Sequence, residues 1–438
     1  MTLKRKEAIW IIIYVLLILS PLLILLLAPR PAGRTFWREL SVALGFVGLS
    51  LMGLQFIPTA RLPFLGQIFP MDTLYSFHHR ISIAAFLLTL AHPVILFIHN
   101  PYTLRLLNLF SAPWRARAGV VAILALILLI ITSVRRVALG IGYEVWHIWH
   151  DIFSVVIAGL ALYHIFNVDY YTSVPLQRGL WIVMGVLWGG MLLYIRVIRP
   201  WILLQRPYKV VEVIEERGAT WSLVLEPVGH EGLTFRAGQV AWLSIGHSPF
   251  HIEQHPFSFS SSAENAERFA FAIKELGDFT DEIGDVPVGT TVYVDGPYGT
   301  FDLFHHEGTS YVFIAGGIGS APVMSMLRTL ADRNASRPLQ FIYGNTTWEG
   351  VIFREELERL EQQLNLEVVH VLEKPSEDWE GEAGFITKDV LKRRTCCQDR
   401  TCTYFICGPL PMIELVEGAL EEMGVPRQRI YSENYEMA

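Results

Sequence analysis

Hydrophobic residues form long, nearly unbroken runs in the first 200 residues and short alternating runs after that. A helix needs about 20 consecutive apolar residues to cross a bilayer. Six runs approach or exceed that length, at roughly 8–28, 38–57, 76–99, 118–134, 144–167 and 179–198. The first follows Lys4, Arg5 and Lys6 like a signal peptide, but no small-residue cleavage site comes after it. We therefore predict an all-α membrane domain of six spans over residues 1–200.

From residue 207 the pattern changes to short segments in which apolar and polar residues alternate. Strands are predicted at Tyr208–Ile214, Trp221–Glu226, Val240–Ile245 and Arg268–Ile273, with turn residues between them. A series of such strands without helical patterns favours a soluble antiparallel β-barrel, which we place at 207–303.

Strands alternate with helices in the last third of the chain. Buried strands are predicted at 310–315, 339–343, 367–372 and 403–406, and Ala321–Arg333 has a helical pattern. This alternation is typical of a doubly wound α/β domain with a parallel sheet, which we place at 304–438.

Composition and charge support a membrane half joined to a soluble half. Hydrophobic residues make up 52% of the chain, and the mean hydropathy of +0.37 is too high for an ordinary soluble protein. Residues 1–200 carry 16 Lys and Arg against 6 Asp and Glu, whereas the remainder carries 19 against 36. The acidic soluble half and the net charge of −7 give no reason to expect a nucleic-acid partner.

Six spans place both ends of the chain on one side of the membrane. Nine basic residues would then lie on that side: Lys4, Arg5, Lys6, Arg61, Arg80, Arg135, Arg136, Arg196 and Arg199. Seven would lie on the other: Arg30, Arg34, Arg38, Arg105, Arg115, Arg117 and Arg178. The positive-inside rule mildly favours cytoplasmic termini in the plasma (inner) membrane. A soluble domain that uses a cytosolic nucleotide favours the same orientation.

Histidines in the third and fifth spans have matching spacings. His78 and His92 are 14 residues apart, and so are His150 and His164. Fourteen steps of about 100° return to nearly the same helix face, displaced by about 21 Å along the axis. Because these two spans run in the same direction, the histidines can meet in pairs at two depths and supply both axial ligands of a haem at each. His79, next to His78, remains an alternative ligand, although it points about 140° away from the face of His92.

Two motifs in the predicted barrel suit a flavin. The segment 255–261 offers a ring, hydroxyls and backbone donors for an isoalloxazine and its ribityl chain, through His255, Pro256, Phe257, Ser258, Ser260 and Ser261. A second segment, 271–280, leads from a strand into a helix start, where Gly277 and Thr280 suit a phosphate and Lys274 adds charge. An ordinary strand edge and a simple helix cap would look similar.

Two motifs in the α/β domain suit a dinucleotide. A glycine-rich loop with Gly316, Gly317, Gly319 and Ser320 directly follows a buried strand and opens a helix, the usual cradle for a pyrophosphate. Cys407, Gly408 and Pro409 end another buried strand, at the sheet edge where a nicotinamide would lie.

Taken in order, these motifs resemble known families. Residues 207–438 resemble the ferredoxin–NADP reductase superfamily through HPFSFSS, KELGDFT, the GPYG turn after Asp295, AGGIGSAP, CGP and an aromatic residue at Tyr435. Residues 72–198 resemble the ferric reductase transmembrane domain through the sequences that contain His78 and His150. The whole resembles the NADPH oxidase and ferric reductase family in a compact bacterial form.

The resemblance implies FAD on the barrel, NADPH or NADH on the α/β domain and two b-type haems in the membrane. His78 with His150 would hold the inner haem, and His92 with His164 the outer one. Tyr435 would cover the flavin and Cys407 would contact the nicotinamide. His255 stands where many soluble relatives have Arg. The segment Asn345-Thr-Thr347 lacks an evident Arg for a 2′-phosphate, so a strong NADPH preference is not expected.

The expected activity is electron transfer from NAD(P)H to an acceptor outside the membrane. Oxygen, reduced to superoxide, is our first hypothesis, and a ferric chelate is the second. An electron-donating cytochrome for an extracytoplasmic protein, and a haem or ion transporter, are alternatives from other classes. The predicted outer connections are short, which favours a small diffusible acceptor. Membrane lipid is an expected partner, and a homo-oligomer is left open.

Overall fold

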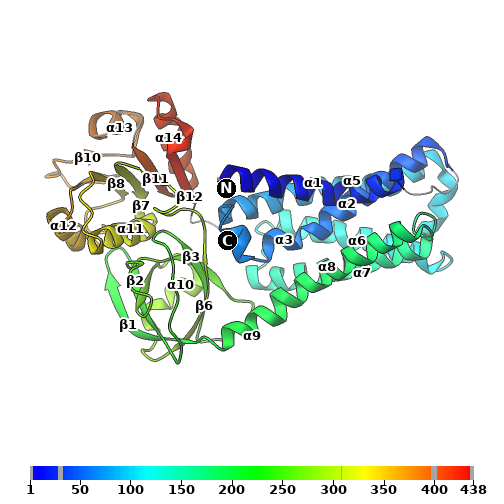
Figure 1. The fold of residues 1–438 in the computed structure, drawn as a ribbon, viewed down its shortest axis with the longest axis horizontal. Coiled ribbons are helices and arrows are strands. Elements are labelled where there is room, and N and C mark those ends of the chain that lie inside the picture. The colour runs from blue at the N-terminus through cyan, green and yellow to red at the C-terminus, as the bar shows by residue number, and fades with distance from the viewer. Residues whose placement is uncertain (1–2, 28–32, 307, 396–401, 435–438) are drawn as a thin grey trace. The chain divides into compact units, whose positions relative to one another are not determined.

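The computed structural model describes residues 3–27, 33–306, 308–395 and 402–434. The chain divides into two compact units. Unit 1 comprises residues 1–62 and 73–199, and unit 2 comprises residues 63–72 and 200–438. The elements of both are shown in Figure 1.

Unit 1 is a bundle of helices, six of which are long and apolar enough to cross a membrane. Short helices cap or connect several of them, and the sixth continues through a π-helical turn, Tyr194–Ile198, into α9 (Arg199–Leu204). The six are α1 (Leu3–Leu27), α2 (Phe36–Leu54), α5 (Met71–His99), α6 (Trp114–Val134), α7 (Tyr143–Val168) and α8 (Pro175–Leu193). The six predicted spans are thus all helical, because apolar side chains and internally bonded backbone suit a hydrocarbon environment.

The first part of unit 2 is a six-stranded antiparallel sheet in the order β4-β3-β6-β1-β2-β5. Beyond β4, Phe259 bridges to Phe271 of β5, so the two outer strands meet and the sheet curls into a barrel. Phenylalanines and aliphatic residues fill its interior, including Phe235, Phe259 and Phe271. The strands are β1 (Tyr208–Glu216), β2 (Thr220–Pro227), β3 (Val240–Ile245), β4 (His255–Ser258), β5 (Phe269–Lys274) and β6 (Thr291–Tyr298).

The second part of unit 2 is a six-stranded parallel sheet in the order β10-β9-β8-β7-β11-β12. Alternate residues of β7 face opposite layers: Phe313 packs with α11 and α12, whereas Ile314 packs with α13 and α14. The strands are β7 (Tyr311–Gly316), β8 (Leu339–Asn345), β9 (Leu366–Leu372), β10 (Glu382–Ala383), β11 (Thr403–Gly408) and β12 (Ile430–Asn434). The helices are α11 (Ser320–Asp332), α12 (Arg354–Gln363), α13 (Lys388–Arg394) and α14 (Leu410–Glu422). The predicted fold class, a six-helix membrane bundle with a β-barrel and a doubly wound α/β domain, is confirmed.

Helix α11 binds the α/β part of unit 2 to the barrel. Arg328 donates to the carbonyl oxygen of Ser260 at 2.6 Å and forms a two-pronged ion pair with Glu356. On the same helix, Ser325 donates to the Ser261 carbonyl and Thr329 accepts from the Ala263 amide. The segment that follows the first flavin motif is therefore held by the helix that follows the glycine-rich loop.

We predict that Arg328→Gln lowers the free energy of unfolding of unit 2 by about 2 kcal/mol, because it leaves the half-buried Glu356 carboxylate and the Ser260 carbonyl without their partner. Arg333→Gln is the matched control, since Arg333 pairs with Glu264 across the same boundary but is 60% exposed. It should cost less than about 1 kcal/mol. Thermal unfolding of the two purified variants measures both. Equal losses would show that the Arg328 contacts do not stabilise the boundary.

Candidate functional site

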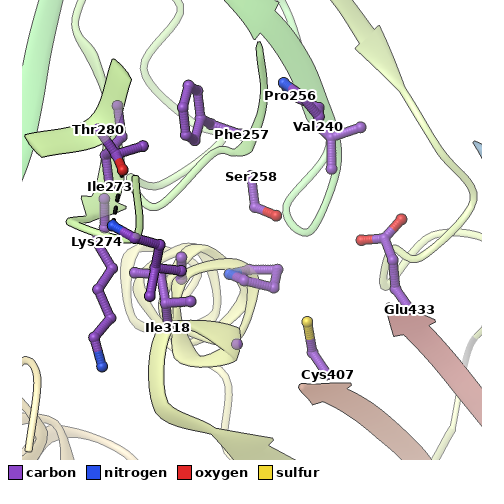
Figure 2. A pocket seen from close by; sticks show the side chains of 15 residues that line it. Val240, Pro256, Phe257, Ser258, Ile273, Lys274, Thr280, Ile318, Cys407 and Glu433 are labelled. Atoms are coloured by element: carbon purple, nitrogen blue, oxygen red, sulfur yellow. Dashed lines mark hydrogen bonds between the residues drawn. The ribbon is translucent and has the colours of Figure 1, made fainter. Parts of the chain in front are cut away.

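A pocket lies within unit 2 between the barrel and the carboxyl ends of the parallel strands (Figure 2). The barrel contributes residues from β3, β4, β5 and the helical turn α10 (Asp278–Asp281). The α/β part contributes the end of the glycine-rich loop, the start of α11 and the ends of β11 and β12. The lining residues are Val240, Pro256, Phe257, Ser258, Ala272, Ile273, Lys274, Leu276, Thr280, Ile318, Gly319, Ala321, Pro322, Cys407 and Glu433.

Seven residues that the sequence singled out line this one pocket: Pro256, Phe257, Ser258, Lys274, Thr280, Gly319 and Cys407. They come from both parts of unit 2 and are up to 151 positions apart in the chain. The two groups of motifs, assigned separately to a flavin and to a nicotinamide nucleotide, therefore face a common space. This is the arrangement that hydride transfer between two bound cofactors requires.

The glycine-rich loop packs tightly against the end of β11. A Cβ atom on Gly319 would lie 2.3 Å from the carbonyl oxygen of Cys407, so only glycine fits there. Gly317 has a φ of +53°, a conformation that other residues rarely adopt. Tyr343 of β8 donates to the Gly317 carbonyl or the Ser320 hydroxyl, at 2.9 and 3.0 Å, and so ties the neighbouring strand to the same loop. The loop is therefore held close to the strand ends on both sides.

The remaining predicted residues that the structure describes are not among those that line the pocket. His255 stacks on Phe279 with ring centres 4.0 Å apart, and Ser260 is fully buried. The Ser261 hydroxyl accepts from the Ala270 amide at 2.9 Å. Thr280 lines the pocket, but its hydroxyl accepts from the Leu276 amide and donates to the Gly277 carbonyl, so it closes its own turn. Gly316 ends β7, Gly408 ends β11, Pro409 precedes α14, and Tyr435 lies outside the described residues.

Of the charged side chains that line this pocket, Glu433 is the one that the sequence analysis did not single out. It lies on β12 directly beside Cys407 of β11 in the parallel register, and its side chain is turned toward the space that Ser258 also faces (Figure 2). The residue is 3% exposed, and neither carboxylate oxygen has a hydrogen-bond partner among the described residues. Burial, reinforced by the charges of Asp72 and Asp302, raises the pKa of Glu433 well above its usual range. Its surroundings therefore favour the neutral form of this carboxyl.

Cys407 shares this environment. It is 1% exposed, and burial together with the neighbouring Glu433 raises the pKa of its thiol. A thiolate nucleophile needs a lowered pKa, so Cys407 is suited to contact a bound ring as a neutral side chain rather than to attack it.

In unit 1, the predicted histidine pairs come together. The ring centres of His78 and His150 are 6.2 Å apart, and those of His92 and His164 are 6.4 Å apart. Both pairs join α5 to α7 at two levels of the bundle. His79 is exposed, so the structure brings His78 rather than His79 to His150.

Neighbouring groups hold the Nδ1 side of these rings. His78 Nδ1 is 3.1 Å from the amide oxygen of Gln55, and His164 Nδ1 is 2.7 Å from the carbonyl oxygen of Arg115. His92 Nδ1 lies 3.1 Å from the carbonyl oxygen of Ser41 and 2.9 Å from its hydroxyl. His150 Nδ1 is 3.9 Å from the carboxylate of Asp151, which pairs with Arg196. In His78, His92 and His164, where Nδ1 can donate to these oxygens, Nε2 carries the free lone pair.

Glycines on two other helices leave room for the rings of the second pair. A Cβ atom on Gly45 of α2 would lie 3.2 Å from His92, and one on Gly119 of α6 would lie 2.8 Å from His164. Within the described part of the chain, there is no group of three or more His, Cys, Asp or Glu residues that could hold a metal ion. Each of the two histidine pairs supplies two such residues, one fewer than a group of three.

Comparisons with known proteins agree with this division. Residues 44–161 match the family described as ferric reductase like transmembrane component, and residues 313–418 match the oxidoreductase NAD-binding domain. The chain thus joins a segment similar to the ferric reductase like transmembrane component to a segment that matches the oxidoreductase NAD-binding domain.

Curated relatives match the second half of the chain. The reductase component of propane 2-monooxygenase from Mycolicibacterium goodii is 31% identical over 225 residues, which are 49% of this chain and 63% of that protein. NADH-cytochrome b5 reductase 1 from Candida glabrata is 27% identical over 157 residues, 35% of this chain and 55% of that protein. The chain thus spans less than two thirds of the length of these relatives.

Among solved structures, flavohemoglobin from Malassezia yamatoensis, with bound FAD and heme, has a TM-score of 0.51 at 18% identity. The alignment covers 92% of this chain and all of that one. The cytochrome P450 reductase GcoB from Amycolatopsis has a TM-score of 0.47 at 24% identity and covers 52% of this chain and 69% of that one. At these identities the flavohemoglobin likeness concerns the fold alone.

We predict that Glu433→Gln, which imitates the neutral acid, makes unit 2 more stable than the native protein at high pH. A carboxyl whose folded pKa is raised contributes stability that is complete below its unfolded pKa of about 4.3 and is lost as the pH rises toward the folded value. The advantage of the glutamine variant should therefore grow between pH 5 and 8, by at most about 1.4 kcal/mol per pH unit. Chemical unfolding at several pH values measures it, and a difference that does not depend on pH would contradict a neutral Glu433.

Proposed function

We propose that the chain is a transmembrane flavocytochrome b that moves electrons from cytosolic NAD(P)H through FAD and two b-type haems to an acceptor on the other side of the membrane. The proposal rests on two pairs of facing histidines, His78 with His150 and His92 with His164. Along both α5 and α7, the histidines of the two pairs are 14 residues apart. The reductase-type half of the chain supports a nicotinamide nucleotide as the electron source.

The histidine couples fit a metal with two axial imidazoles. Imidazole nitrogens bind metals at about 2 Å, so two rings on opposite sides of one iron have centres roughly 6 Å apart. The measured 6.2 and 6.4 Å agree with that spacing. Hydrogen bonds at Nδ1 of His78, His92 and His164 fix the tautomer that leaves Nε2 for the metal. Haem would supply one-electron storage at each level, and ligation by two histidines leaves no open position on the iron.

The pocket of unit 2 fits a flavin next to a nicotinamide. Apolar side chains such as Phe257, Ile273 and Ile318 line it and exclude water. A flavin would accept the two electrons of a hydride and release them singly, which haem requires. Ser258 from the barrel and Glu433 from the α/β part line the pocket, burial favours the protonated form of Glu433, and Lys274 adds a positive charge. We infer that Glu433 donates a hydrogen bond to a ring atom or carboxamide of a bound cofactor.

Two acceptors remain candidates. Oxygen, which would give superoxide, needs no binding site beyond access to the outer haem edge. A ferric chelate would need a surface that attracts it. An electron-donating cytochrome would need a protein partner. A haem or ion transporter has no use for a nucleotide-binding half and is the least supported alternative.

Steady-state kinetics of the purified protein test the proposal. NADH or NADPH is offered as donor, with oxygen, ferric citrate or no acceptor, and superoxide and ferrous iron are measured separately. Nucleotide oxidation that depends on one of these acceptors supports the proposal. Nucleotide oxidation that reduces the flavin but never the haem would contradict it.

We predict that replacing His92 or His164 by Ala removes one haem per chain, because the facing imidazole alone holds the iron weakly. Flavin reduction by NADH should stay within about twofold, since the nucleotide and flavin motifs lie in the other unit. Haem content by absorbance and flavin reduction by stopped flow measure the two effects. His79→Ala is the matched control and should keep both haems, because His79 is exposed beside the ligand position. Full haem content in either His92 or His164 variant would refute the pairing.

The preference for NADPH over NADH depends on whether a cation near the end of β8 can bind the 2′-phosphate. A 2′-phosphate needs a dedicated cation. Arg354 lies over the Trp348 ring at 4.7 Å and pairs with Glu355 at 3.2 Å. Burial lowers the pKa of His370, whose ring centre is 5.0 Å from that of Trp348, to about 4, so it is neutral at pH 7. Neither residue is an evident phosphate ligand.

We therefore predict that NADH and NADPH are both used, with a preference below about a hundredfold in kcat/KM. Arg354→Ala and Lys374→Ala form a matched pair, since the Lys374 amide donates to the Thr346 carbonyl at 2.8 Å and its side chain is exposed. A larger NADPH preference that Arg354→Ala abolishes would show that Arg354 reaches the phosphate after all. A larger preference lost only in Lys374→Ala would locate the phosphate at the end of β9.

A further inference from the structure

A row of aromatic rings runs through the interior of unit 1, from α8 across α2 to the connection that follows α7. The ring centres of Trp188 and Trp181 on α8 are 6.4 Å apart. Phe46 on α2 lies 5.3 Å from Trp181 and 5.7 Å from Tyr171. All four residues are buried, and Trp181 is fully inaccessible. We call Trp188, Trp181, Phe46 and Tyr171, in this order, the aromatic row.

The aromatic row extends over the same length of α2 as the two histidine pairs. Near the end of the helix, a Cβ atom on Gly53 would lie 1.9 Å from the first ring of the row, while Gln55, directly after the helix, contacts His78. At the beginning of the helix, Glu39 contacts the last ring of the row, and Ser41 contacts the second histidine pair. The row therefore begins and ends at about the levels of the two pairs.

The body of α2 separates the aromatic row from the histidines. Steps of about 100° per residue place Ser41 about 140° and Gln55 about 180° away from Phe46 around the helix axis. The row and the histidines thus contact opposite sides of one helix. A separation of one helix diameter, about 10 Å, follows from this arrangement.

Packing alone does not explain why the aromatic row contains two tryptophans. The indole N–H groups of Trp181 and Trp188 are buried and have no hydrogen-bond partner among the residues that the structure describes. A buried polar group without a partner is destabilising, and phenylalanine would fill an apolar interface without that cost. The indoles must therefore contribute something that a phenyl ring lacks. One such property is that an indole gives up one electron far more readily than a phenyl ring does.

The aromatic row ends at a tyrosine that has its own proton acceptor. The Tyr171 hydroxyl donates to one carboxylate oxygen of Glu39 at 2.5 Å, and the other oxygen accepts from the Arg34 amide at 3.1 Å. Burial, reinforced by the hydrogen bond to Glu39, raises the pKa of Tyr171, which favours the protonated phenol. A phenol that loses an electron becomes strongly acidic, and a carboxylate at this distance can take its proton directly. The tryptophans of the row have no such acceptor among the described residues.

We propose that Tyr171 is a redox-active tyrosine and that the aromatic row conducts oxidising equivalents to it from the interior of the bundle. A one-electron oxidant, of the class of oxygen-centred radicals, takes an electron from Trp188 or Trp181. Tyr171 replaces that electron across Phe46, and its hydroxyl proton passes to Glu39. The oxidant has then gained one electron, and the protein holds a neutral tyrosyl radical and a protonated carboxyl. A small reductant such as ascorbate supplies one electron, and the proton returns from Glu39.

The site would protect the histidine pairs, because an oxidising equivalent that reaches Tyr171 no longer attacks the residues around them. This role goes beyond the proposed function, which concerns electrons that come from a nicotinamide nucleotide. It requires neither a bound nucleotide nor a particular acceptor.

A photo-oxidant attached to the full-length chain in detergent tests the proposal. A ruthenium polypyridyl complex is bonded to the cysteine of a Gly190→Cys variant in which the other accessible cysteines are changed to serine. Gly190 is exposed two residues after Trp188, and a Cβ atom there would meet nothing within 4 Å. A flash in the presence of persulfate oxidises the complex, which then takes one electron from the protein. We expect electron paramagnetic resonance to show a neutral tyrosyl radical that forms more slowly in deuterated buffer, because a proton moves with the electron.

Four further changes in the labelled chain separate the parts of the site. Tyr171→Phe should abolish the tyrosyl signal, and Trp181→Phe should remove most of it, because this complex does not oxidise phenylalanine. Glu39→Gln keeps a hydrogen-bond acceptor but takes up no proton, so the radical should form more slowly and the effect of deuterated buffer should disappear. Tyr102→Phe is the matched control and should leave the signal unchanged, since Tyr102 is 66% exposed and lies outside the row. Thermal unfolding shows whether each variant is folded.

The contradicting outcomes differ in what they exclude. No tyrosyl radical in the labelled chain, or an equal signal after Tyr171→Phe, would mean that Tyr171 is not redox-active. A full signal after Trp181→Phe would mean that the row is only a packing feature. Equal rates in ordinary and deuterated buffer would mean that Glu39 does not take the proton. Because the flash requires no nucleotide and no turnover, failure of the proposed electron transfer would leave this test intact.

Discussion

An imidazole inside an apolar bundle must have its N–H group hydrogen-bonded, and this requirement orients the rest of the membrane unit. An unsatisfied donor in hydrocarbon costs several kcal/mol by the usual estimates. For three rings this requirement is met by Gln55, directly after α2, by the carbonyl and hydroxyl of Ser41 on α2 and by the Arg115 carbonyl on α6. Once Nδ1 is held, the opposite nitrogen of each ring faces the space between α5 and α7. Helices α2 and α6 therefore contribute to the site without supplying a ligand.

In unit 2, too, a few polar groups have to be positioned within mainly apolar surroundings. A pocket that favours hydride transfer has to exclude water, yet it needs a few polar groups to orient the two rings. Its walls are mainly apolar, and burial raises the pKa of Glu433, the acid among its lining residues, which favours the neutral form. The register that sets Cys407 opposite Glu433 on adjacent parallel strands brings both groups to the strand ends, where the glycine-rich loop closes on them.

The sequence predicted those features that depend on local periodicity. Six apolar runs became six helices, and the 14-residue spacing of the histidines on two parallel spans predicted which rings would meet. Gly319 lies at the carboxyl edge of the parallel sheet, where such loops gather, and Pro256 and Lys274 on barrel strands line the same pocket.

Features that depend on long-range pairing could not be predicted in this way. Glu433 resembles any acid near a chain end, and its burial follows from the alignment of β12 with β11. The Arg115 carbonyl that contacts His164 is a backbone group, so no pattern of side chains predicts it. The need for glycine at Gly119 could not be predicted either, because both features depend on how closely α6 approaches α7. The hydroxyl of Thr280, assigned to a phosphate, instead closes its own turn, since the nearest backbone donor and acceptor lie within four residues.

The central claim is that two histidine couples each hold one haem with both axial positions filled. Electron paramagnetic resonance of the oxidised, purified chain, combined with a haem assay per polypeptide, tests it most directly. The account predicts two haems per chain, both low-spin, because two imidazoles produce a strong axial field. One haem per chain, or a high-spin signal from an iron with an open position, would contradict it.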